Sequence, residues 1–176
     1  MMMERSSNGV PAQVIHNLGF GYIHGAMHHA NLFDAANGRV LWLAGDYVGS
    51  YKARRIAAVN DPDTAQGGTA KGFATLVDLA FRGAFGDRGF AASRMVASRR
   101  RNRSWIFREG VDAGYVDEAG KIGDGKRQDG VFIHCEVVKL THSSLGRTFI
   151  LAYHDAPGIA PVARGVFAAL NDYLGV

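Results

Sequence analysis

Two groups of residues in this chain have types and spacings that could support chemistry. The first is Lys121-Ile-Gly123-Asp124, which comes directly before two segments of alternating apolar residues, 131–140 and 147–153. Such alternation is typical of half-buried strands, so the lysine is expected on an edge strand of an antiparallel sheet. The second is the pair His24 and His28, whose i, i+4 spacing places two imidazoles on one helix face, as in zinc sites with a third ligand.

The elements that precede Lys121 are predicted from apolar periodicity and from capping residues. A helix is expected after Ser6-Ser-Asn8, with Gly19 as its stop, and a second short helix over residues 22–30. Thr69 is a natural N-cap for a longer helix. The apolar face of that helix comprises Phe73, Leu76, Val77, Ala80 and Phe81.

Two stretches between these helices and the strands have weaker patterns. The segment 45–68 is rich in turn-forming residues and is predicted as a long surface loop, with Gln66-Gly-Gly68 as part of it. A shorter helix is expected between residues 85 and 107, with Met95 and Val96 on its inner face.

The C-terminal part is predicted as an antiparallel sheet closed by a helix. Residues 141–146 form a compact polar turn that suits a hairpin between two strands. An amphipathic helix packed on the sheet follows, with a stripe of Ile159, Val162, Val166, Phe167, Leu170, Tyr173 and Leu174. We therefore predict a single α+β domain over residues 1–176, helical over about 6–110 and completed by the sheet and closing helix over about 115–176.

The composition favours one globular domain, because 47% of the 176 residues are hydrophobic and 20% are charged. The net charge of +4 comes largely from the run 99–103, which is predicted as a solvated helix end, so nucleic-acid binding is not expected. No apolar run is long enough for a transmembrane helix. Residues 1–7 lack an apolar signal-peptide core, which leaves localisation open. Cys135, the single cysteine, is expected to be a small buried residue.

The order of these motifs resembles that of the serine β-lactamases and penicillin-binding proteins, class A type. Ser6 and Asn8 match the Ser-x-Asn motif of that family, and Lys121-Ile-Gly123 matches its Lys-Thr-Gly. The resemblance covers almost the whole chain but corresponds to the C-terminal two-thirds of the family fold. It therefore implies a β-lactamase or transpeptidase-like fold whose N-terminal part is missing.

The resemblance also implies roles for individual residues. Lys121 would supply positive charge to a substrate carboxylate, and Ile122, Gly123 and Asp124 would present a backbone edge to a peptide-like substrate. Ser6 would relay a proton toward the leaving nitrogen, while Asn8 would position the substrate. A β-lactam, a peptidoglycan stem peptide or an ester would be the substrate. No cofactor is implied.

The nucleophile of that family is the serine of a Ser-x-x-Lys motif. No serine in this chain has a lysine three residues later, and the segment 53–68 contains no glutamate for activating a deacylating water. The domain is therefore predicted to lack acyl-transfer activity by itself. Two alternatives remain: a noncatalytic interaction module whose exposed strand edge favours a homo-oligomer or strand-swapped dimer, or a His-rich metal-binding domain.

Overall fold

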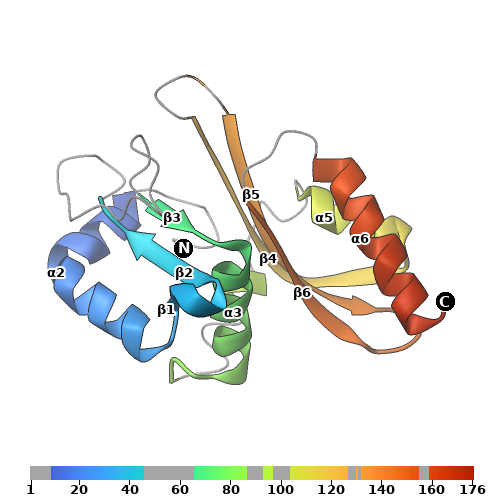
Figure 1. Ribbon diagram of the computed structural model, residues 1–176, viewed down its shortest axis with the longest axis horizontal. Coiled ribbons are helices and arrows are strands. Elements are labelled where there is room, and N and C mark those ends of the chain that lie inside the picture. The colour runs from blue at the N-terminus through green and yellow to red at the C-terminus, as the bar shows by residue number, and fades with distance from the viewer. Residues whose placement is uncertain are drawn as a thin grey trace.

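The computed structural model describes residues 9–45, 66–86, 93–96, 104–126, 130, 132–154 and 159–176. Within these residues the chain forms helices and two three-stranded antiparallel sheets, which confirms the predicted α+β class. Figure 1 shows the larger sheet in the middle of the molecule, with helices on both of its faces.

The larger sheet consists of three strands in the order β4-β5-β6. These are β4 (Tyr115–Lys126), β5 (Phe132–His142) and β6 (Thr148–His154), each antiparallel to the next. A hairpin turn joins β5 to β6 as predicted: the N–H of His142 donates to the carbonyl of Arg147 over 2.8 Å. Gly146 adopts a φ of 63° in this turn, a value that glycine reaches without steric cost.

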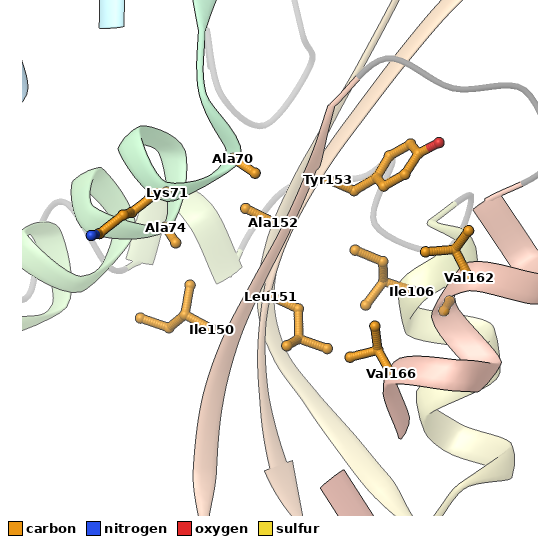
Figure 2. Close-up of a pocket in the computed structure, with 11 residues that line it drawn as sticks. Ala70, Lys71, Ala74, Ile106, Ile150, Leu151, Ala152, Tyr153, Val162 and Val166 are labelled. Atoms are coloured by element: carbon orange, nitrogen blue, oxygen red, sulfur yellow. The ribbon is translucent and has the colours of Figure 1, made fainter. Parts of the chain in front are cut away.

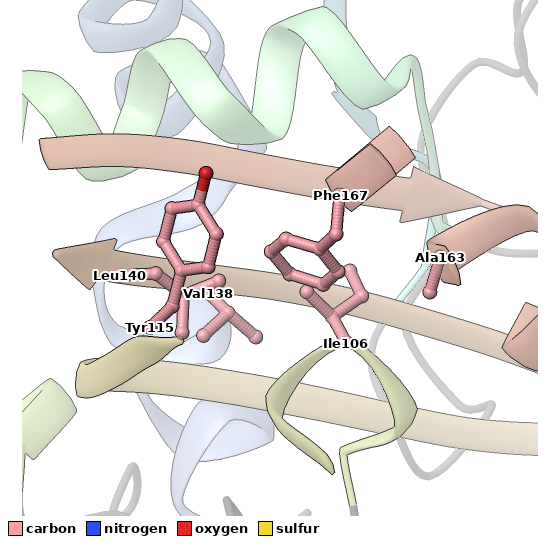
Figure 3. Close-up of a cluster of buried hydrophobic side chains, with 6 residues drawn as sticks. All are labelled: Ile106, Tyr115, Val138, Leu140, Ala163 and Phe167. Carbon is pink, nitrogen blue, oxygen red and sulfur yellow. The ribbon is translucent and has the colours of Figure 1, made fainter. Parts of the chain in front are cut away.

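One face of the larger sheet is covered by α5 (Trp105–Asp112) and α6 (Ile159–Leu174) (Figure 1). Figure 3 shows the core formed there, in which Phe167 of α6 lies against side chains from α5 and the sheet. The buried residues of this core are Ile106, Tyr115, Val138, Leu140, Ala163 and Phe167.

The closing helix α6 is confirmed, but its inward face differs from the predicted stripe. Ala163 and Phe167 are 5% and 1% exposed, whereas Val162, Val166 and Tyr173 are 51%, 39% and 81% exposed. The prediction was wrong for these three because apolar residues cover more than half of the helix circumference, so periodicity alone does not define the rotation. An apolar strip of α6 therefore remains uncovered by the described residues.

The other face of the larger sheet is covered by α3 (Ala70–Arg82). The predicted N-cap is confirmed, since the Thr69 hydroxyl oxygen accepts a hydrogen bond from the N–H of Gly72 over 3.1 Å. Val77 is buried against Val137 of β5 and Ala119 of β4. The side of the sheet that carries Lys121 therefore faces α3.

The N-terminal part contains a small sheet that was not predicted. Its strands are β1 (Phe33–Asp34), β2 (Arg39–Leu43) and β3 (Gln66–Gly68), in the order β1-β2-β3, with the single-turn helix η1 (Ala35–Asn37) between the first two. The expected loop is thus wrong at residues 66–68, and this part is not purely helical. The rest of that loop, residues 46–65, lies outside the described residues.

Two glycines, Gly68 of β3 and Gly72 of α3, lie close to β2, and the first leaves β3 without a strand signal. A Cβ atom at Gly68 would lie 2.7 Å from Leu41 Cδ2, and one at Gly72 would lie 2.7 Å from the carbonyl oxygen of Val40. Glycine is therefore required by the close approach of β3 and α3 to β2. A side chain at either position would force these elements apart.

Helix α2 (Gly9–His29) contains both predicted N-terminal helices. Gly19 has a non-helical φ of 76° and ψ of 153°, so the predicted stop is a kink between two helical halves. Val10, Val14 and Leu18, which marked the first half by their spacing, are 42–49% exposed, whereas Ile15 is 3% exposed.

Helix α5 was not predicted. The expected helix between residues 85 and 107 is represented in the described part by residues 93–96, where Met95 is buried and Val96 is 43% exposed. Val96 is therefore not on an inner face. The aromatic and β-branched residues at the start of α5 have modest helix propensity, and its N-cap Ser104 is supplemented by a tertiary contact with Glu136.

Candidate functional site

The predicted substrate-binding residues lie on strand β4, which is an edge strand among the described residues. Lys121 pairs with Val137 and Gly123 with Cys135, while Ile122 and Asp124 occupy the alternate positions. Because successive side chains of a strand point to opposite faces, the structure separates the four residues into two pairs. Lys121 and Gly123 face α3, whereas Ile122 and Asp124 face α5 and α6.

Lys121 is half-buried, and its Nζ donates a 2.5 Å hydrogen bond to the carbonyl oxygen of Ile122. At Gly123, two residues further along the same face, no described atom would lie within 4 Å of an added Cβ. Among the described residues, the strand surface beside Lys121 is therefore uncovered at Gly123. A ligand carboxylate over Gly123 would lie beside the ammonium group and could also contact the strand backbone.

A second lysine, Lys139, lies on the α3-facing side of the sheet. Lys139 forms an ion pair with Glu118, and its Nζ lies 4.8 Å from the centre of the Phe81 ring. Burial lowers the pKa of Lys139. The Glu118 carboxylate also accepts a hydrogen bond from the hydroxyl of Thr141. This pair braces β4 against β5 near the lysine of the candidate site.

Ile122 and Asp124 have other surroundings. Ile122 is 2% exposed and can offer a ligand only its backbone. The Asp124 carboxylate lies 2.5 Å from Nδ1 of His134, its cross-strand partner on β5. Asp124 therefore belongs to a different cluster from Lys121, on the opposite face of the sheet.

That cluster consists of Asp124, His134 and Glu136, and the sequence analysis did not identify it. Nε2 of His134 lies 2.5 Å from Glu136 Oε1, so the imidazole bridges two carboxylates. Burial alone would lower the pKa of His134, but hydrogen bonds and charge interactions with Glu136 and Asp124 outweigh it, and the pKa is raised above its ordinary value. A protonated imidazole can donate one N–H to each carboxylate.

Glu136 also organises the start of helix α5. Its carboxylate accepts the hydroxyl hydrogen of Ser104 at 2.5 Å and the backbone N–H groups of Trp105 at 2.7 Å and Ile106 at 3.0 Å. Ser104 in turn caps the helix by accepting the N–H of Phe107 over 2.9 Å. A carboxylate at this position satisfies the free N–H groups and the positive end of the helix dipole.

This second cluster has the residue types of an acid–base site but not its accessibility. Both ring nitrogens of His134 are already bonded to carboxylates, and Ser104 is 1% exposed. A catalytic base needs a nitrogen within reach of the substrate, and a nucleophile needs an exposed oxygen. We therefore interpret the cluster as a structural clasp between β4, β5 and α5.

A groove of about 320 Å³ lies at the opposite edge of the same sheet (Figure 2). Its lining includes residues 150–153 of β6, Ala70 and Ala74 of α3, and Val162 and Val166 of α6. The lining is predominantly apolar, with Lys71 at the α3 side. The groove therefore offers a small polar ligand few hydrogen-bonding groups.

Three further features of the sequence analysis lie outside the described residues: Ser6, Asn8 and the arginine run 99–103. Cys135, expected to be buried, is of intermediate exposure.

The pair His24 and His28 does share one face of α2, as its spacing predicted. The His24 ring stacks on Trp42 at 3.7 Å between centroids, and its Nε2 lies 2.8 Å from the carbonyl oxygen of Leu43. The His28 ring lies 4.9 Å from that of Phe33. These histidines therefore pack α2 onto β1 and β2. The described part of the chain contains no group of three or more His, Cys, Asp or Glu side chains placed to hold a metal ion.

No protein-family model, curated protein or solved structure matches this chain. Among the described residues, no helix combines the length and the apolar character that crossing a membrane requires.

Proposed function

We propose that this chain carries the substrate-holding part of a β-lactamase-like or penicillin-binding-type serine hydrolase site. One observation carries the proposal: Lys121 and Gly123 share one face of β4, which is an edge strand among the described residues, and no described atom lies within 4 Å of a Cβ built at Gly123. The closing helix α6 on one side of this sheet and α3 on the other are further features expected from the resemblance.

The chemistry of this strand suits a small carboxylate ligand with an amide backbone. A lysine ammonium attracts a carboxylate and donates charge-assisted hydrogen bonds to it, while a strand edge can pair with the amide groups of an extended ligand. β-Lactams and peptidoglycan stem peptides carry both features, and esters with a carboxylate carry the first. In this proposal Asn8 positions the ligand, and Ser6 would relay a proton only where a nucleophile is supplied from elsewhere.

The expected activity is binding without turnover, because no Ser-x-x-Lys nucleophile is present in the sequence. The test is therefore a binding measurement. We expect benzylpenicillin or an N-acyl-D-Ala-D-Ala peptide to shift the amide NMR signals of Lys121 and Gly123. Lys121→Ala should weaken this binding by about tenfold or more, since a hydrogen bond to a charged group contributes about 1.5–3 kcal/mol.

Arg82→Ala provides a matched control, because it also removes one positive charge but from an exposed position on α3. Its affinity for the ligand should be unchanged. A ligand whose carboxylate is replaced by a neutral amide should bind wild type and Lys121→Ala equally. Signals of β4 that do not move, or an affinity that Lys121→Ala leaves intact, would contradict the proposal.

A noncatalytic interaction module is the second candidate function. The observation that favours it is the groove along β6, where strand residues and helix side chains remain accessible together. This surface lies at the edge of the sheet away from Lys121, so the two functions are compatible and separately testable.

A further inference from the structure

The outer edge of strand β6 has the features of a docking surface for one more β-strand. Among the described residues β6 pairs only with β5, and no strand lies on its other side. Four consecutive residues of this edge, 150–153, line the groove of about 320 Å³. Figure 2 shows β6 running between the α3 residues and the α6 residues of the groove.

The groove is apolar on both faces of the sheet. Ile150 and Ala152 belong to the core under α3, and the groove continues from them to Ala70 and Ala74. Leu151 and Tyr153 belong to the core under α6, and the groove continues from them to the α6 valines. An added strand would place its alternate side chains on these two walls. An apolar strand therefore fits better than a helix or a small polar ligand.

The exposed apolar strip of α6 lies beside this edge. Val162 and Val166 are 51% and 39% exposed and both line the groove. Their spacing of four residues places them on one helix face. A strand added to β6 would lie next to them and remove them from water, which stabilises the assembly through the hydrophobic effect.

The sequence of β6 allows it to pair with a second copy of itself. Antiparallel pairing centred on Leu151 places Thr148 opposite His154, Phe149 opposite Tyr153 and Ile150 opposite Ala152. No like charges meet in this arrangement, and aromatic pairs across strands are favourable. The strand contains none of the lysine, glutamate or proline residues that commonly protect an exposed edge from pairing.

We propose that β6 is a homodimer interface, at which two copies of the chain pair antiparallel through this edge. The β4-β5-β6 sheets of the two copies then form one continuous six-stranded sheet, and Val162 and Val166 become buried beside the junction. The inference rests on the interaction-module candidate and is independent of ligand binding at Lys121. An isologous interface of this kind closes after two copies.

Light scattering coupled to size-exclusion chromatography over a concentration series tests this inference with the full chain. Wild type should form a concentration-dependent dimer. Val162→Glu and Val166→Glu each place two carboxylates at the junction, and each should raise the dissociation constant by at least about tenfold. Val111→Glu is the matched control, because Val111 is a helical valine of 50% exposure on α5 that does not line the groove. The dimer of this variant should have the same dissociation constant as that of wild type.

Hydrogen exchange of the wild-type chain supplies a second measurement that needs no variant. Amides of residues 150–153 should become more protected as concentration rises, while those of β4 should not change. A wild-type monomer at every accessible concentration would overturn the inference. So would a dimer that the two groove variants leave intact, or one whose β6 amides gain no protection. Each of these results leaves the Lys121 proposal untouched.

Discussion

The hydroxyl of Ser104 donates a 2.5 Å hydrogen bond to the carboxylate of Glu136, which follows it by 32 residues. Both residues are buried, with exposures of 1% and 2%. The contact attaches the first turn of α5 to the middle of β5. Because the same carboxylate also holds His134, a single buried acid links the start of a helix to the cross-strand contact with Asp124.

Removal of this carboxylate should destabilise the fold strongly. Glu136→Ala leaves the Ser104 hydroxyl and two backbone N–H groups of α5 without their acceptor, and we expect a loss of about 3 kcal/mol in the free energy of unfolding. Urea denaturation measures this loss. Glu109→Ala on the same helix removes a carboxylate that pairs with Arg164, the two side chains being 14% and 59% exposed, and should cost clearly less than Glu136→Ala. Equal losses for the two variants would contradict the capping role.

Protonation of His134 should make stability depend on pH. Its folded pKa is raised above the ordinary value of 6.5, so its contribution is fully present below pH 6.5 and is lost as pH rises through the folded pKa. The urea midpoint of wild type should therefore fall over this range. In His134→Gln this component of the fall should be absent. A wild-type midpoint that rises with pH through this range, with the rise absent in the variant, would show the opposite sign.

Alanine substitutions at two helical glycines should have opposite effects. In α3, Gly72→Ala brings a Cβ atom within 2.7 Å of the Val40 carbonyl oxygen, and we expect a destabilisation of about 1–3 kcal/mol from overpacking. In α2, Gly25→Ala meets no atom within 4 Å and should stabilise by roughly 0.5–1 kcal/mol through helix propensity. Thermal unfolding of both variants checks the predicted signs.

Two aromatic residues of α6 should differ sharply in their contribution to stability. Phe167 is 1% exposed and lies 5.0 Å from the Tyr115 ring, so Phe167→Ala should cost about 3–5 kcal/mol. Tyr173 is 81% exposed, and Tyr173→Ala should change stability by less than about 0.5 kcal/mol. Similar unfolding midpoints for the two variants would show that the helix face has been assigned incorrectly.

Much of the fold was predictable from local patterns. Thr69 signalled the start of α3, the alternation around residues 131–153 predicted the β5–β6 hairpin, and Gly19 marked the break in α2. Each of these signals depends on neighbours in the sequence, through backbone sterics or a periodic apolar face. Strand β3 was missed because Gly68 is required by its close contact with Leu41, which is distant in the sequence.

The candidate site, too, has one part that was predictable from the sequence and one that depends on tertiary packing. The sequence by itself identified Lys121-Ile-Gly123 and the strand that carries it, because a motif and an alternating pattern are both local. Only the tertiary structure decided that Asp124 turns away from Lys121 to bind His134, and that Glu136 caps α5. Strand pleating and register determine which residues share a face, and helix rotation determines which apolar residues remain exposed. These depend on packing between segments far apart in the chain, which no local pattern encodes.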